Sequence, residues 1–222
     1  AFLDAYEPGT WFSSIDRDGR YAYARQPDIM RWNLERLGEA FASLLSDDPA
    51  RAAAVAAESV AAFDRRYEVH RAAAYRAKLG LGERVPDAEI TALADAALAV
   101  LEEHGVDFTG FWRDLAAAAD GDERVVRGRF LGPVAGLDDW LARWTALAPD
   151  ATAIRAANPV YIPRNHLVEE ALAAAVTGDL APFERLLGIL RDPFAERTDA
   201  AYRRFALPAP DDAARHVTFC GT

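Results

Sequence analysis

The histidines are the side chains best suited to hold a transition metal, but their spacing does not favour a metal site. No two of them lie three or four residues apart, as a two-histidine site on one helix requires. His166 with Glu169 and Glu170 offers three ligands on consecutive turns, yet a carboxylate-bridged site needs a Glu-x-x-His partner that the sequence lacks. We expect His166 to hydrogen-bond a loop instead and His70 to lie in the core. The four histidines are His70, His104, His166 and His216.

Other patterns that could carry chemistry are incomplete. Cys220 stands two residues from the C-terminus, which makes it a poor preorganised nucleophile. In "DRDGRY", aligning Asp16 with a calcium loop puts Arg25 where a bidentate glutamate must stand, so we expect a turn. "GLGERV" at Gly80 lacks a third glycine and follows a helical pattern, so it predicts no dinucleotide site. There is no Gly-x-Ser-x-Gly and no Walker sequence. The residues by themselves predict no catalytic, cofactor-binding or metal-binding side chain.

Composition narrows the class of protein further. The net charge of −10, without a segregated basic patch, opposes binding to nucleic acid or to an anionic membrane. No long uncharged apolar stretch predicts a membrane span, and the first residues do not resemble a signal peptide. A single cysteine cannot form an internal disulfide, which is typical of the cytoplasm. One lysine, Lys78, among 25 basic residues and abundant alanine indicate a GC-rich bacterial coding sequence.

The elements that would position any site are helices. Apolar residues recur every three to four positions through most of the chain, whereas the alternation typical of strands is nearly absent, so we expect an all-α fold. Residues 1–25 are the exception, because Pro8-Gly9 and Asp16–Gly19 are turn formers. We expect this segment to be a loop with a short hairpin that ends at Tyr21–Tyr23.

The expected helices follow one another to residue 192. They begin at Pro27, at Pro49 (ending at Gly80), at residue 87, at the cap Asp107, within "LDDWLARWTALAP", within "NPVYIPRNHLVEEALAAAVTGDL" (ending at Gly178), and at Pro182. The expected buried faces are Ile29, Trp32, Leu37, Ala40, Phe41, Leu44 and Leu45; Ile90, Leu93, Ala94, Ala97, Leu98 and Leu101; and Leu167, Val168, Ala171, Leu172, Ala175 and Val176. The tail after Pro193 is rich in proline and ends without periodicity.

Several blocks of the sequence stand in a recognisable order. They are "FLDAYEPGTWFSSIDRDGRYAYARQPDIMRWNLERLGEA" (2–40), "RAKLGL" (76–81), "DFTGFWRDLA" (107–116), "WLARW" (140–144), "NPVYIPRNHLVEEAL" (158–172) and "GDLAPFERLLGILRDPF" (178–194). In content and spacing they resemble the selenoprotein O family, also called SelO or YdiU, whose members are pseudokinase-like protein adenylyltransferases. The resemblance runs from residue 2 to 222.

The resemblance implies a fold and an activity. This chain is similar to the C-terminal half of the family, the helical C-terminal lobe of a protein-kinase-like fold, with an activation-segment-like loop at 1–25 and a helical C-lobe domain at 26–222. The family transfers AMP from ATP to Ser, Thr or Tyr hydroxyls of proteins, using Mg²⁺. Its D-Y-G-P-F aspartate, which holds the metal, and its other nucleotide-binding groups belong upstream of Ala1. We therefore expect no ATP or Mg²⁺ bound by this chain alone, no activity without the missing N-terminal half as its partner, and protein substrates only for the full-length enzyme.

Redox control of the family type is in doubt here. Some members pair an activation-segment cysteine with the C-terminal one, but Phe12 occupies the corresponding position, and the chain ends Cys-Gly-Thr instead of Cys-Ser-Ser. A redox role for Cys220 and an ordinary exposed thiol are both open.

Polar positions within the blocks are expected to join helices through buried hydrogen bonds, with a direct functional role as the alternative. These are Asn33, Arg143, Asn158, Arg164, Asn165 and His166. For the whole chain, a bacterial, cytoplasmic enzyme fragment is the first hypothesis, and a stand-alone helical interaction module without catalysis is the second.

Overall fold

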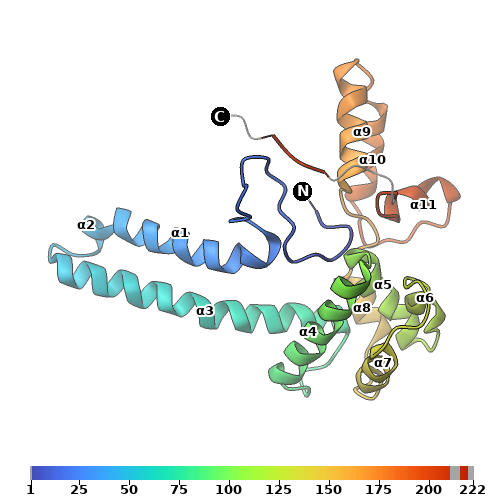
Figure 1. Ribbon diagram of the computed structural model, residues 1–222, viewed down its shortest axis with the longest axis horizontal. Helices are drawn as coiled ribbons and strands as arrows, with labels where there is room; N and C mark the ends of the chain where they lie inside the picture. The colour runs from blue at the N-terminus through green and yellow to red at the C-terminus, as the bar shows by residue number, and fades with distance from the viewer. Residues whose placement is uncertain (1, 211–215, 220–222) are drawn as a thin grey trace. The chain divides into compact units, whose positions relative to one another are not determined.

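The chain is all-α, as the sequence predicts. The computed structural model describes residues 2–210 and 216–219, and within them no strand forms; two isolated β-bridges join Ala5 to Asp107 and Ser13 to Thr218 (Figure 1). The helices are η1 (Tyr23–Arg25), α1 (Gln26–Ala40), α2 (Ala42–Leu45), α3 (Pro49–Leu79), α4 (Asp87–His104), α5 (Phe108–Ala119), α6 (Arg124–Arg127), α7 (Leu137–Thr145), α8 (Ala151–Ala157), α9 (Asn165–Val176), α10 (Ala181–Leu190) and α11 (Ala200–Ala206).

Two compact units share the chain, and the division falls within α3. We call Ala1–Glu7 with Tyr75–His216 the core unit, and Pro8–Ala74 with Val217–Thr222 the hairpin unit. The prediction of a boundary near residue 25 stays a prediction. No described helix, the long α3 included, has the combination of length and apolar character that crossing a bilayer demands.

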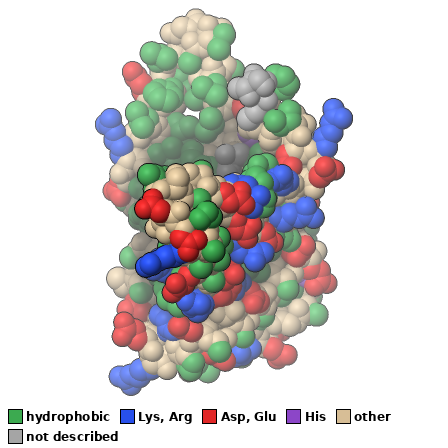
Figure 2. All heavy atoms as spheres, turned by 90° about the vertical axis from the view of Figure 1, so that its left-hand side faces the viewer, with side chains coloured by type: hydrophobic (Ala, Val, Ile, Leu, Met, Phe, Trp, Pro, Cys, Tyr) green, Lys and Arg blue, Asp and Glu red, His purple; other side chains and the backbone are tan. Residues whose placement is uncertain are grey.

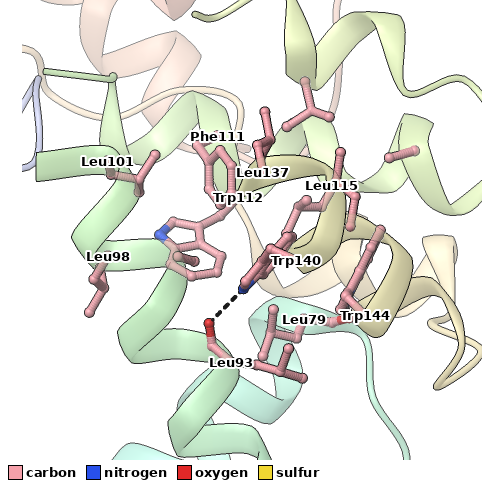
Figure 3. Packing of buried hydrophobic residues seen from close by; sticks show 14 of the residues in the cluster. Leu79, Leu93, Leu98, Leu101, Phe111, Trp112, Leu115, Leu137, Trp140 and Trp144 are labelled. Atoms are coloured by element: carbon pink, nitrogen blue, oxygen red, sulfur yellow. Dashed lines mark hydrogen bonds between the residues drawn. The ribbon is translucent and has the colours of Figure 1, made fainter. Parts of the chain in front are cut away.

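The main hydrophobic cluster of the core unit is built from α4, α5 and α7. The expected stripe of α4 is buried along its whole length, from Ile90 to Leu101. Trp140 and Trp144 stack on each other with ring centroids 5.8 Å apart. Each buried indole nitrogen also donates a hydrogen bond. Trp140 donates to the carbonyl of Leu93 (2.8 Å; Figure 3), and Trp144 donates to the carbonyl of Leu79 (3.0 Å).

Local signals set the helix ends in this unit. Gly105 ends α4 in the left-handed conformation (φ 60°), and the carboxylate of Asp107 accepts the N–H of Gly110 at the start of α5. Gly80 (φ 66°) ends α3, and a Cβ there would lie 2.5 Å from Ile154 Cγ1 and 2.6 Å from the carbonyl of Asp150. This position therefore requires glycine both for its backbone angle and for the close approach of α8.

A second, smaller cluster belongs to α9, α10 and α11. Its buried members are Tyr161, Leu167, Leu186, Ile189 and Phe205. The sequence pattern predicts no helix after residue 192, but Ala200–Ala206 forms α11 with Asp199 as its N-cap. The predicted face of α9 was right for Leu167 and Ala171 and wrong for Leu172 and Val176, which are exposed.

The hairpin unit contains α1, α2 and most of α3, and the described residues show no hydrophobic cluster in it. Within this unit α1 and α3 run side by side (Figure 1), and Gly38 lets them approach, since a Cβ there would lie 3.0 Å from that of Ala56. The predicted burial of the apolar face of α1 was wrong: Trp32, Leu37 and Phe41 are all exposed. An apolar pattern predicts which face is apolar but not what covers it.

Two smaller predictions for the hairpin unit were also wrong. Tyr23–Arg25 forms the short helix η1 rather than the end of a hairpin. His70 is exposed on α3 instead of lying in a core, because it points to the opposite side of the helix from the buried Ala72.

Candidate functional site

The most strongly organised polar group of the core unit centres on Arg164. Its residue precedes α9, and its side chain is fully buried. One guanidinium nitrogen donates to Oδ1 of Asp107 (2.5 Å) and also to Asp4, while the other donates to Oδ2 of Asp107 (3.0 Å) and to the carbonyl of Ala206 (3.1 Å). We call Arg164, Asp107 and Asp4 the arginine junction. It ties together the N-terminal segment and the starts or ends of α5, α9 and α11.

The N-terminal segment 2–7 is held by backbone hydrogen bonds as well. The N–H of Tyr6 donates to the carbonyl of Val106 (3.0 Å), and the N–H of Phe108 donates to the carbonyl of Asp4 (2.7 Å). Asn165 clamps Phe2: its amide oxygen accepts the Phe2 N–H (3.1 Å) and its amide nitrogen donates to the Phe2 carbonyl (2.7 Å).

These contacts cover the segment along its length. Asp4 also accepts the N–H of Ala209 (3.1 Å), and the ring of Tyr6 stacks on Phe108 with centroids 5.7 Å apart. Segment 2–7 is therefore a docked part of the core unit.

The electrostatics of the junction favour its charged form. Burial disfavours the charged guanidinium of Arg164, but hydrogen bonds to Asp107 and Asp4 outweigh it and raise the pKa of Arg164. Arg129 adds a second cation, 3.6 Å from Asp107 and 2.5 Å from Asp114. Burial raises the pKa of Asp114, and the contact with Arg129 opposes that rise. Because the carboxylates are paired, the junction is suited to holding segments in place and not to proton transfer.

A second polar group surrounds Asn158, which is fully buried. Its oxygen accepts from Lys78 Nζ (3.1 Å), and its amide nitrogen donates to the carbonyls of Lys78 (2.9 Å) and Ile154 (3.0 Å). Arg113 in turn donates to the carbonyls of Asn158 (3.1 Å) and Arg155 (2.8 Å). Burial lowers the pKa of Lys78. The group joins the end of α3 to α5 and α8 within the core unit.

The prediction of buried hydrogen-bond networks is confirmed for Asn158 and Arg164, and Asn165 joins distant parts of the chain at the surface. It was wrong for Arg143, which forms an exposed ion pair with Glu89 (2.8 Å), and for Asn33, which is exposed on α1. Arg143 reaches from α7 to α4 at the surface, and Asn33 lies on an exposed side of α1.

His166 lies beside the arginine junction but carries no ligand set. Its Nδ1 is buried and has no hydrogen-bond partner in the described part of the chain, so the expected bond from this nitrogen to a loop is not formed. Burial lowers the pKa of His166. The neighbouring carboxylates turn to other partners, Glu169 to His216 (3.7 Å) and Glu170 to Arg204. Across residues 2–210 and 216–219, no group of three potential ligands gathers.

Two of the remaining residues considered in the sequence, Asp16 and Gly80, have structural roles in a turn and at a helix end. The carboxylate of Asp16 accepts the N–H groups of Arg20 (2.8 Å) and Tyr21 (2.9 Å), which confirms the turn. Gly80 caps α3, as expected. Cys220 lies outside the described residues.

Sequence reasoning identified Arg164 and the cap Asp107 but missed that they pair, and it missed Asp4 entirely. The available signal was chemical: an arginine among apolar residues, following Pro163, needs an acidic partner when buried. No periodicity connects it to an aspartate 160 positions away.

Comparison with known proteins identifies the class. The family model described as "Protein adenylyltransferase SelO" matches residues 1–191. The chain therefore belongs to the SelO/YdiU protein nucleotidyltransferase family.

Individual relatives carry the name "Protein nucleotidyltransferase YdiU". One from Mycobacterium sp. (strain KMS) is 50% identical over 222 residues, which are 100% of this chain and 45% of the relative. One from Cereibacter sphaeroides is 53% identical over 228 residues, 100% of this chain and 46% of the relative. One from Pseudarthrobacter chlorophenolicus is 46% identical over 226 residues, again with the whole chain covered and 45% of the relative. The chain spans about half the length of the curated relatives it matches.

Proposed function

We propose that this chain is the C-terminal portion of a bacterial, cytoplasmic protein adenylyltransferase, which transfers AMP from ATP to Ser, Thr or Tyr hydroxyls of protein substrates. In this proposal the chain corresponds to the helical lobe of a kinase-like fold. The remaining portion of the full-length protein supplies the groups that hold ATP and Mg²⁺. The chain alone is inactive.

The arginine junction is the observation that supports this role. Family resemblance puts the start of the activation segment at "AFLDAYEPG" and a metal-holding aspartate shortly before it. Arg164, Asp107 and Asn165 fix segment 2–7 against the core unit. The residues that precede this segment in the full-length protein are thereby held at a defined place on the core unit. Catalysis by positioning requires such fixed geometry.

The inactivity of the isolated chain follows from the chemistry of AMP transfer. Metal ions and cationic side chains must neutralise the phosphates, and the loss of one such stabiliser typically costs about 100- to 1000-fold in rate. The charged side chains of the arginine junction are already paired with one another, Arg164 with both Asp107 and Asp4. They offer no open cationic cradle for a triphosphate.

Calorimetric titration with Mg-ATP tests the proposal. The full-length protein should bind Mg-ATP, and the 222-residue chain should show no heat of binding above that of dilution. Mg-ADP and Mg-GTP serve as controls for non-specific phosphate binding. Failure of the full-length protein to bind Mg-ATP would contradict the proposed activity.

An interaction module without catalysis is the second candidate. The exposed large hydrophobic side chains of α1 and α2 favour it, because contiguous exposed apolar surface marks binding sites. Full-length protein that forms complexes but transfers no AMP to any protein hydroxyl would select this alternative.

A further inference from the structure

An unpartnered hydrophobic stripe runs along α1 into α2. It consists of Met30, Leu34, Leu37, Phe41, Leu44 and Leu45. The members recur at three- to four-residue intervals and so lie on one side of the helical segment. Five of the six are more than 40% exposed even though they are large, and Leu44 reaches 76%.

The hairpin unit leaves most of this stripe uncovered. Gly38 makes the contact of α1 with α3 at the edge of the stripe. Leu37 lies about 100° from Gly38 around the helix axis and Phe41 about 60°, and both side chains stay more than 40% exposed. The same region holds a groove of about 570 Å³ lined mainly by alanines of α3, by residues of α1 from Arg31 to Glu39, and by Ala42 at the start of α2. Both features leave apolar surface in water.

The charges around the stripe favour a protein partner over a lipid or nucleic acid surface. Arg31 and Arg36 alternate with Glu35 and Glu39 along α1, so neither sign dominates. Figure 2 looks at the hairpin from the α2 end and shows hydrophobic side chains at the surface among charged side chains of both signs. An anionic membrane or a phosphate backbone would require an excess of basic residues.

We infer that the stripe on α1 and α2 is the docking surface for the remaining portion of the full-length protein. This inference rests on the proposed function, since it needs that portion to exist beside this chain. The curated relatives are about twice as long as the chain, so each carries a comparable mass of protein that this chain does not contain. A second copy is a poorer occupant, because each copy carries a net charge of −10.

The periodicity also indicates the kind of surface that docks. A stripe with three- to four-residue spacing accepts an apolar helix face, which buries such positions by ridge-into-groove packing. The docked element is therefore expected to be helical, with apolar residues facing Leu37 and Phe41.

Cysteine footprinting tests this assignment. In a Cys220→Ser background, Leu37→Cys and Phe41→Cys each report the stripe, and Leu131→Cys is the matched control because Leu131 is fully exposed on the core unit. The rate of maleimide labelling is measured in this chain and in the full-length protein. We expect labelling at 37 and 41 to slow at least tenfold in the full-length protein and labelling at 131 to stay unchanged.

Other outcomes overturn the inference in distinguishable ways. Equal labelling of 37 and 41 in both proteins would show that the remaining portion does not cover the stripe. Slow labelling already in this chain would assign the stripe to the core unit if light scattering finds a monomer, and to a second copy if it finds a dimer. Because labelling does not depend on catalysis, protection without AMP transfer would uphold the docking surface while refuting the proposed function.

Discussion

Replacing Arg164 by methionine should destabilise the core unit by about 3 kcal/mol. Removing one partner of a buried ion pair typically costs about 3–5 kcal/mol, because the other charges stay buried without compensation. The substitution removes two hydrogen bonds to Asp107, one to Asp4 and one to the carbonyl of Ala206. Asp107 keeps the Gly110 N–H and Asp4 keeps the Ala209 N–H, which puts the expected cost at the lower end of the range.

The assay is thermal and urea unfolding followed by near-ultraviolet circular dichroism. At about 2–4 °C per kcal/mol for a unit of this size, the melting temperature should fall by roughly 6–12 °C. Arg143→Met is the matched control, because its pair with Glu89 is exposed and such pairs contribute about 0–1 kcal/mol. If Arg164→Met unfolds within 1 kcal/mol of the parent chain, or no earlier than Arg143→Met, the junction does not hold the unit together.

Two further predictions concern His166 and Gly80. Burial lowers the pKa of His166 in the folded protein, so the neutral side chain contributes stability above the unfolded pKa near 6.5, and this contribution is lost as pH falls through the lower folded pKa. The substitution His166→Leu should therefore reduce the loss of stability between pH 7 and pH 5, measured by urea unfolding. An unchanged pH profile of stability would argue against this role of His166. Gly80→Ala should lower the free energy of unfolding by about 2 kcal/mol more than Gly105→Ala. Both glycines have φ near 60°, but only at Gly80 would the added Cβ collide with Ile154 and Asp150. Equal melting temperatures of the two variants would show that the neighbouring atoms move aside at no cost.

Helices that have both a continuous apolar face and residues typical of helix ends could be predicted from the sequence. In α4 the stripe from Ile90 to Leu101 and the terminal Gly105 were enough, because the partner helices lie in the same chain and cover that face. In α1 the same reasoning gave the helix but not its environment. The short α11 escaped because seven residues carry too little periodicity to stand out from a proline-rich tail.

The candidate site could be predicted only in part, for a physical reason. The residue types of Arg164 and Asn158 indicated buried hydrogen bonds, and burial of a polar side chain demands partners. Which partners those are depends on the tertiary fold, which brings Asp4 next to Arg164 across most of the sequence. Spacing rules apply within helices and cannot report such a contact.

Transfer of labelled AMP from ATP to protein is the measurement that tests the account most directly. The account predicts that the full-length protein labels a protein substrate or itself on Ser, Thr or Tyr in the presence of Mg²⁺, and that the 222-residue chain under the same conditions incorporates no label above a no-enzyme blank. Incorporation catalysed by the 222-residue chain alone would contradict it, because the groups that bind ATP and Mg²⁺ would then lie among the helices described above.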